Sequence, residues 1–192
     1  MNNETVTIDH YLAAYLVDGL ERIAEVALTE LARAGSIDLG ADLRRIGDAR
    51  GVNWTSAPTA QQLGVVPTVS VCGPLPAAAG DVAREVYELI GREPGQSVVR
   101  LLDRIPGLES VVAVLSSAAA ADLASPRNDA PTKAGKKLVK ALKHDYPLFT
   151  TGYDDILMAL AVRGPVVLVR SDRPELATAL TSRPSASSTR SA

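Results

Sequence analysis

Hydrophobic and polar positions follow helical spacing through most of the chain, most clearly in two consecutive segments near its start. In 20–34 (LERIAEVALTELARA) apolar residues recur every three or four positions, and charged residues fill most of the others. The preceding segment, 7–18, has apolar residues at similar spacing. The candidate caps and stops are Thr7 or Asp9, Gly19 and Gly35. The pattern predicts a short helix followed directly by a longer one.

A different pattern follows the second helix, in 36–47 (SIDLGADLRRIG). Its apolar residues alternate around Gly40, as the two arms of a short hairpin would. These apolar residues are Ile37, Leu39, Leu43 and Ile46. Helix, turn, helix and hairpin is the order of a winged-helix unit, which we therefore expect over 1–50.

Residues 51–80 are rich in proline and glycine and contain no helical period, so they predict a loop-rich connector. Within it, 63–72 (LGVVPTVSVC) alternates well enough for one edge strand interrupted by Pro67. We expect the boundary between two structural units here.

The pattern of 81–180 repeats the helical order of the first unit. Helices are expected at 81–91 with Asp81 as cap, at 97–105 with Ser97 as cap, and at 108–123, whose Ala, Val, Leu and Ser predict the most buried helix. An amphipathic helix is expected from Thr132, and a helix, or a helix and short strand, over 152–169. The Ser-rich tail 181–192 is expected to be disordered. The predicted fold class is mostly α with short β-hairpins, arranged as tandem winged-helix or helix-turn-helix-like units.

Composition supports a helical core and an intracellular site. The chain has 192 residues, 46% of them hydrophobic but only 4% aromatic, which favours close-packed Ala, Leu and Val helices. A single cysteine and a start without a secretory pattern predict a cytoplasmic protein. The apolar run 156–169 is interrupted by Arg163 and Pro165 and is shorter than the roughly 20 residues of a membrane span, so no transmembrane segment is expected.

Few residues in the chain are suited to catalysis or metal binding. Zinc sites usually need four Cys or His ligands, and only Cys72, His10 and His144 are present. A dyad of Cys72 and His144 is the one catalytic alternative; a packed thiol is the simpler interpretation. The adjacent Asp154 and Asp155 fit a helix cap better than a shared ligand site. The sequence therefore predicts no catalytic residues, no metal and no cofactor.

Charge decides between nucleic acid and protein as the partner. The net charge is -2, the second helix carries three glutamates, and 108–120 has no Lys or Arg, all of which disfavour DNA. Positive charge is concentrated between Arg127 and Lys143. Its lysines are Lys133, Lys136, Lys137, Lys140 and Lys143. This face could contact phosphates or an acidic partner, or could simply be solvated.

Residues 11–37 (YLAAYLVDGLERIAEVALTELARAGSI) resemble the opening of an actinobacterial family of uncharacterised proteins, which follows the pattern AYLxGGxxRxxxxALxxLxxxG. Segments 81–115, 131–147 and 157–180 fit the family in the same order. Members are often described as membrane proteins with Gly- and Cys-rich tails. This chain differs on both points, and Asp18 replaces the first glycine of the pair.

The resemblance implies a winged-helix-like N-terminal domain and a genetic association with multinuclear non-haem iron enzymes that modify ribosomally made peptides. We therefore expect a non-catalytic accessory protein that binds a peptide or such an enzyme. Its partner-binding residues would be Ile37, Leu39, Leu43 and Ile46 on a hairpin edge, and Lys133, Lys136, Lys137 and Lys140. The alternative is a DNA-binding transcriptional regulator that uses the lysine face.

Overall fold

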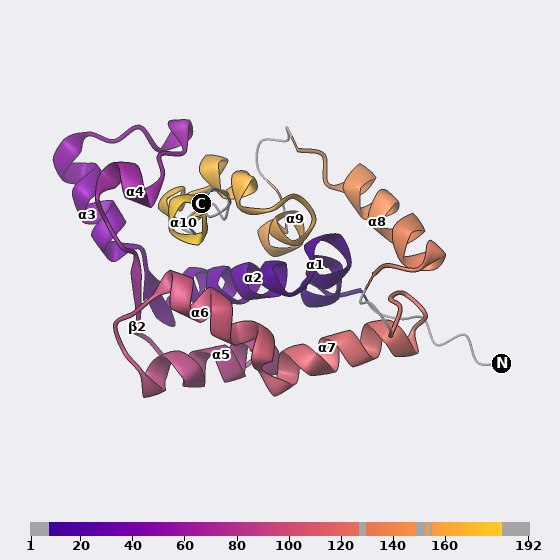
Figure 1. Ribbon diagram of the computed structural model, residues 1–192. Coiled ribbons are helices and arrows are strands. Elements are labelled where there is room, and N and C mark those ends of the chain that lie inside the picture. The colour runs from indigo at the N-terminus through magenta and orange to yellow at the C-terminus, as the bar shows by residue number, and fades with distance from the viewer. Residues whose placement is uncertain (1–7, 127–129, 149–152, 154, 182–192) are drawn as a thin grey trace, which may run out of the picture.

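The computed structural model describes residues 8–126, 130–148, 153 and 155–181, and this part of the chain is mostly helical (Figure 1). The α-helices are α1 (His10–Asp18), α2 (Leu20–Arg33), α3 (Ala41–Arg50), α4 (Ala60–Leu63), α5 (Asp81–Arg92), α6 (Val98–Arg104), α7 (Glu109–Ala120), α8 (Lys133–Asp145), α9 (Ile156–Arg163) and α10 (Glu175–Leu180). Strands β1 (Ile37–Leu39), β2 (Thr68–Val71) and β3 (Gln96–Ser97) form one antiparallel sheet in the order β1-β2-β3. Short 3-10 segments occupy Trp54–Ser56, Ile105–Gly107 and Pro165–Arg170.

The first two helices confirm the pattern read from the sequence. Asp9 is the N-cap of α1, and its Oδ1 accepts a hydrogen bond of 2.8 Å from the Leu12 N–H. Gly19, with φ of 78°, connects α1 to α2 in a backbone conformation that favours glycine. The two helices therefore pack against each other directly, with no loop between them.

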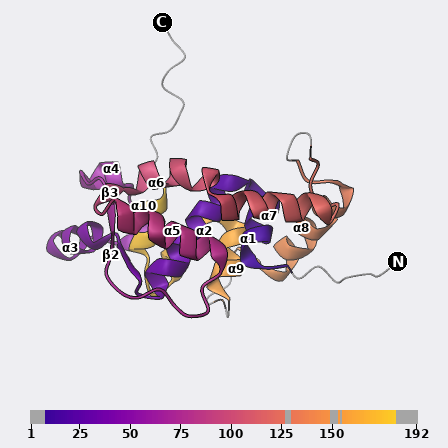
Figure 2. The same cartoon turned by 90° about the horizontal axis from the view of Figure 1, so that it is seen from below.

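Helix α2 runs through the middle of the molecule (Figure 1). It contacts α1, α5, α6, α9 and β1. Its buried residues are Ile23, Ala24, Val26, Ala27, Leu28, Thr29, Leu31 and Ala32. Each large aliphatic side chain buried in this way contributes about 1.5–3 kcal/mol to stability. Seen from below, α5, α6 and α7 cover one side of this helix pair (Figure 2).

The predicted hairpin over 36–47 is wrong. Only Ile37–Leu39 is extended, and it pairs with the distant β2 in the register Ile37↔Val71 and Leu39↔Val69. From Ala41 the chain is helix α3, which begins after Gly40 in the left-handed region, with φ of 83°. Ala, Leu and Arg favour helix, and the spacing of Leu43 and Gly47 places both on its buried face.

The predicted edge strand over 63–72 is also wrong in extent and position. Residues 60–63 form α4, whose N-terminus is closed by a capping box between Thr59 and Gln62. The strand is limited to Thr68–Val71 and lies in the centre of the sheet. Pro67 lies just before the strand, where proline is tolerated, and its carbonyl accepts a hydrogen bond of 2.9 Å from the Val98 N–H.

The second half confirms several predicted helices and corrects the burial of one. Ser97 caps α6 as expected, whereas Gly80, not Asp81, is the N-cap of α5. Helix α7 was expected to be the most buried helix, but only Val111 and Ala118 are buried, and Val112 is 50% exposed. Small apolar residues make this segment a good helix, but its neighbours α1 and α5 cover only part of its surface.

The C-terminal elements pack back onto the N-terminal helices. Residues 165–170, where a short strand was one alternative, form a 3-10 segment after α9. One buried cluster includes side chains from α1 and α2, from α5 to α7, and from α9 and α10. Of the predicted disordered tail, 182–192 lies outside the described residues. Among the helices described, none is both long and apolar enough to cross a membrane.

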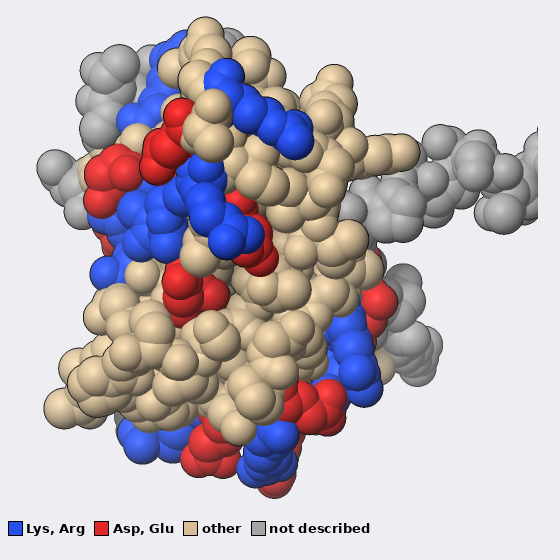
Figure 3. Space-filling view, turned by 90° about the vertical axis from the view of Figure 1, so that its left-hand side faces the viewer, with Lys and Arg blue, Asp and Glu red and all other residues tan. Residues whose placement is uncertain are grey.

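Ion pairs join distant elements at the end of the molecule that carries α3 and the sheet. The buried carboxylate of Glu175 accepts hydrogen bonds from Arg44 at 2.9 Å and from Arg173 at 2.6 Å. Arg44 also bonds Asp38 on β1 at 2.7 Å. Figure 3 shows this end of the molecule, where acidic and basic side chains lie interleaved. Arginine is thus used here to neutralise carboxylates rather than to build a face of one sign.

A pair of glycine substitutions tests the close packing of α8 against the backbone at Leu123. A Cβ at Gly135 in α8 would collide with the backbone carbonyl oxygen of Leu123, whereas a Cβ at Gly91 in α5 would meet only Val71 at 3.9 Å. We expect Gly135→Ala to destabilise the protein by about 1–3 kcal/mol through overpacking. The control Gly91→Ala should stabilise it by about 0.5–1 kcal/mol, because alanine is the better helix former. Urea unfolding measures both; stabilisation by Gly135→Ala would contradict the seating of α8.

Candidate functional site

All five lysines of the chain lie on one helix, α8. Thr132 caps this helix through a hydrogen bond of 3.1 Å from the Gly135 N–H to its Oγ1. The predicted amphipathic character is confirmed, because Leu138, Val139 and Leu142 are half-buried while every lysine is exposed. Helix α8 contacts α1 and α9. The lysine face, defined as Lys133, Lys136, Lys137, Lys140 and Lys143, points away from this packing.

The lysine face has no counter-charge from its own chain in the part that the structure describes. None of the ion pairs found there involves a lysine, although arginines form many. Five like charges on a 13-residue helix repel one another when they are three or four positions apart. A partner with negative charge would relieve this repulsion.

Arg163 fixes the C-terminal end of α8. Its guanidinium donates to the backbone carbonyl of Tyr146 at 2.5 Å and to that of Lys143. A cation at the end of a helix is favourable because the free carbonyls there carry partial negative charge. In the sequence Arg163 only interrupted an apolar run, and the structure shows what it binds.

The predicted hairpin-edge residues are not brought together with the lysine face. Ile37, Leu39 and Leu43 are buried in the core, and Ile46 on α3 is half-buried. Strand β1 does lie at an edge of the sheet. A partner strand would therefore pair with its three-residue backbone rather than contact these side chains, and this use of β1 stays a prediction.

The catalytic alternative of Cys72 with His144 is wrong, because the two residues lie at opposite ends of the molecule. Cys72 follows β2 and its thiol donates to the Gly35 carbonyl at 3.4 Å, while His144 is on α8 (Figure 1). Asp155 caps α9 as expected, and Asp154 is outside the described residues. Within the described ranges there is no group of three or more His, Cys, Asp or Glu that could hold a metal ion.

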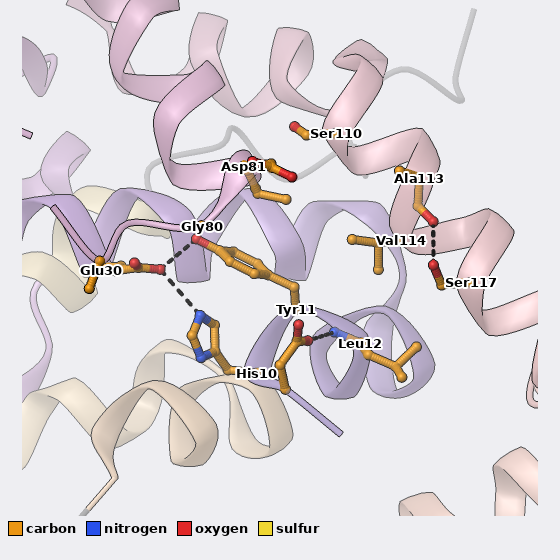
Figure 4. Close-up of a pocket in the computed structure, with 13 residues that line it drawn as sticks. His10, Tyr11, Leu12, Glu30, Gly80, Asp81, Ser110, Ala113, Val114 and Ser117 are labelled. Atoms are coloured by element: carbon orange, nitrogen blue, oxygen red, sulfur yellow. Dashed lines mark hydrogen bonds and ion pairs between the residues drawn. The ribbon is translucent and has the colours of Figure 1, made fainter. Parts of the chain in front are cut away.

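A cavity of about 520 Å³ lies between α1, α2, α5 and α7 (Figure 4). Its lining includes Asp9, His10, Tyr11, Leu12, Glu30, Asp81, Val82, Ser110, Ala113 and Val114. This volume is within the range of about 300–1,000 Å³ that is typical of small-molecule sites. Sequence reasoning missed the cavity because it treated each histidine alone. The one signal available in the sequence was Glu30, a charged residue that lies close to the apolar positions of α2.

Three side chains in this cavity form a hydrogen-bonded set centred on Glu30. Tyr11 donates its hydroxyl to Glu30 Oε2 at 2.5 Å, and His10 Nε2 lies 3.2 Å from the same oxygen. Figure 4 shows Tyr11 and His10 converging on the carboxylate, with Asp81 and Ser110 on the side away from His10. Tyr11 is only 5% exposed, so the position of Glu30 is fixed from within the core.

The protonation states follow from this geometry. Burial and the neighbouring Glu30 carboxylate both raise the pKa of Tyr11, so its hydroxyl remains a donor. Burial opposes ionisation of Glu30, but the hydrogen bonds from His10 and Tyr11 outweigh it and hold the pKa of Glu30 below its usual value. The cavity therefore contains an ionised carboxylate at neutral pH.

A groove of about 390 Å³ adjoins the cavity and shares Asp81, Ser110 and Ala113 with it. The rest of its lining is Arg84, Glu85, Glu88 and Glu109. Glu85 has a structural role, since it accepts hydrogen bonds from the backbone N–H groups of Glu109 at 3.3 Å and Ser110 at 2.8 Å. It thereby caps the first turn of α7 from the neighbouring α5.

Comparisons with protein-family models, with curated proteins and with solved structures gave no match to this chain.

Two tyrosine substitutions test the charge on Glu30. Tyr11→Phe removes a hydrogen bond to an ionised group and should cost about 1.5–3 kcal/mol at pH 7. Because folding lowers the pKa of Glu30, this stabilisation is complete above the unfolded pKa of about 4.3 and is lost as the pH falls through the folded pKa. The loss of unfolding free energy caused by Tyr11→Phe should therefore be smaller at acidic pH than at pH 7.

Tyr87→Phe is the matched control. The Tyr87 hydroxyl donates to the neutral carbonyl of Gly73 at 2.9 Å, so its loss should cost the same at each pH. Urea unfolding of both variants at pH 7 and near pH 3.5 separates the two cases. Equal pH dependence in the two variants would show that Glu30 is not the ionised acceptor of Tyr11.

Proposed function

We propose that the protein is a non-catalytic binding protein whose lysine face on α8 docks an acidic segment of a peptide or protein partner. The observation that carries the proposal is the segregation of every lysine of the chain onto the exposed side of one helix. Lysine is a compact charge on a flexible stem, so several lysines adapt to carboxylates without a fixed geometry.

The use of arginine elsewhere supports a special role for the lysine face. Arg33 pairs with Asp172 at 2.5 Å, and Arg104 pairs with Glu93 at 2.8 Å. Arg44 pairs with Glu175. Arginine thus neutralises carboxylates within the fold, whereas the lysine positive charge is left for solvent or a partner.

Three features favour an acidic protein segment over DNA. Helix α2, the natural recognition helix of an N-terminal helix-turn-helix unit, is packed on several sides and cannot enter a groove. Helix α7 is exposed but carries no basic residue. The α8 helix itself lacks the Arg, Asn and Gln side chains that commonly read base edges.

We further propose that the partner belongs to a pathway that modifies ribosomally made peptides in the cytoplasm, and that a multinuclear iron enzyme or its peptide substrate is the partner. This finer proposal is supported by the resemblance of 11–37 to the actinobacterial family. The expected division into a winged-helix-like unit at 1–50, a connector at 51–80 and a second unit at 81–180 is not part of this proposal, because the hairpin of the first unit is absent from the described residues and one buried cluster joins both halves. Co-purification with a multinuclear iron enzyme encoded near the gene would support this proposal, and the absence of such an enzyme or of co-purification would contradict it.

A charge-neutralising variant tests the lysine face. We expect K136Q/K137Q/K140Q to weaken binding of a fluorescent glutamate-rich dodecapeptide by roughly tenfold or more in low salt, because three charge contacts are lost. The matched control R45Q/R92Q/R100Q removes the same charge from exposed sites elsewhere and should bind nearly as well as the parent. Fluorescence anisotropy measures both.

Three outcomes would contradict the proposal. The first is equal loss of peptide binding in the lysine variant and in its control. The second is absence of peptide binding by the parent. The third is preferential, steeply salt-dependent binding of nonspecific duplex DNA that the lysine variant abolishes, because this would favour the regulator alternative instead.

A further inference from the structure

The cavity around Glu30 and its adjoining groove are rich in carboxylates and poor in cations. Asp9, Glu30 and Asp81 line the cavity, and Glu88 and Glu109 line the groove with Glu85. Among all the lining residues of the two hollows, only His10 and Arg84 are basic. The two hollows adjoin at Asp81, Ser110 and Ala113, which line both, so an elongated molecule could contact both.

Not every carboxylate is equally available. Glu85 already accepts hydrogen bonds from Ser110 and Glu109, and Glu88 pairs with Arg92 at 3.3 Å. Asp9 Oδ1 caps α1. Asp81 is exposed at the first turn of α5, and its carboxylate enters no hydrogen bond or ion pair found within the described residues.

Glu30 is the most rigidly placed of these groups and is still open on one side. Tyr11 and His10 both contact Oε2, and within the described part of the chain no residue donates to Oε1. The Glu30 side chain keeps 20% of its exposure. A fixed carboxylate with one free oxygen facing a cavity is suited to a charged hydrogen-bond donor of a ligand.

Apart from Ser110 and Ser117, whose hydroxyls donate to Glu85 and to the Ala113 carbonyl, the remaining side chains of the walls are apolar. Leu12, Val82, Ala113 and Val114 come from three different helices. In Figure 4, Leu12, Ala113 and Val114 lie on the far side of Tyr11 from Glu30. They would cover methylene groups rather than a second polar head. The lining thus combines fixed negative charge with surface for an alkyl chain.

We propose that this cavity binds an alkylammonium group, with Glu30 and Asp81 as its acceptors and the apolar walls covering the alkyl chain. The adjoining groove accommodates a second ammonium of a linear diamine or the peptide backbone that follows a lysine side chain. This site is separate from the lysine face and does not depend on it, because its charge is opposite and its residues come from other helices.

Calorimetry with small probes tests the site. Butylamine should bind, whereas butanol and butyrate, which match its alkyl chain but not its charge, should not. Putrescine and N-acetyl-lysine methylamide distinguish the two sources of the ammonium group, and tighter binding of either than of butylamine supports the proposal. Binding of butanol equal to that of butylamine would overturn it.

Two variants locate the binding. Glu30→Gln and Asp81→Asn should each weaken butylamine binding roughly tenfold or more, since each removes a charged acceptor. Asp81 is exposed, so its variant remains informative if Glu30→Gln fails to fold. Asp48→Asn, on the exposed side of α3, is the control and should bind like the parent. Unchanged affinity in both cavity variants would overturn the proposal, and K136Q/K137Q/K140Q should leave butylamine binding intact whatever its effect on the acidic peptide.

Discussion

The burial of α2 is the constraint on which the rest of the structure depends. Ile23, Leu28 and Leu31 have no exposed surface, and the helix is contacted by elements from both ends of the chain. Its apolar surface is wider than one neighbour could cover, so α1, α5, α6 and α9 must all close around it. This packing prevents α2 from entering the groove of a partner.

Two surfaces of opposite charge result from this arrangement. Helix α8 packs on α1 and α9 through half-buried leucines and valine and turns its lysines outward. On another side of α1, the acidic cavity lies between α1, α2, α5 and α7. Glu30 links the core and the cavity, because it lies on the central helix α2 and its side chain lines the cavity. The same packing that stabilises the core therefore positions the candidate ligand-binding group.

Local signals in the sequence predicted most of the longer helices but not α3 or α4. Asp9, Ser97 and Thr132 are caps in the structure because a side-chain oxygen satisfies backbone N–H groups that no other part of the chain can reach. Long-range pairing was not predictable in this way. Leu39 and Leu43 fit a hairpin by alternation, but β1 pairs with a strand some 30 residues later. The lysine face was found because it lies on one helix, whereas the cavity was missed because its acidic groups come from three helices.

The central claim is that one core is built around α2, and native-state hydrogen exchange tests it most directly. Amides in the middle of α2, α1, α5 and α9 should exchange only through global unfolding and share one free energy, with α8 and the ends of α7 exchanging more readily. The measurement is made in low concentrations of denaturant and compared with the free energy of unfolding. A lower free energy for α5 to α7 than for α1 and α2, showing that the two parts open separately, would contradict the account.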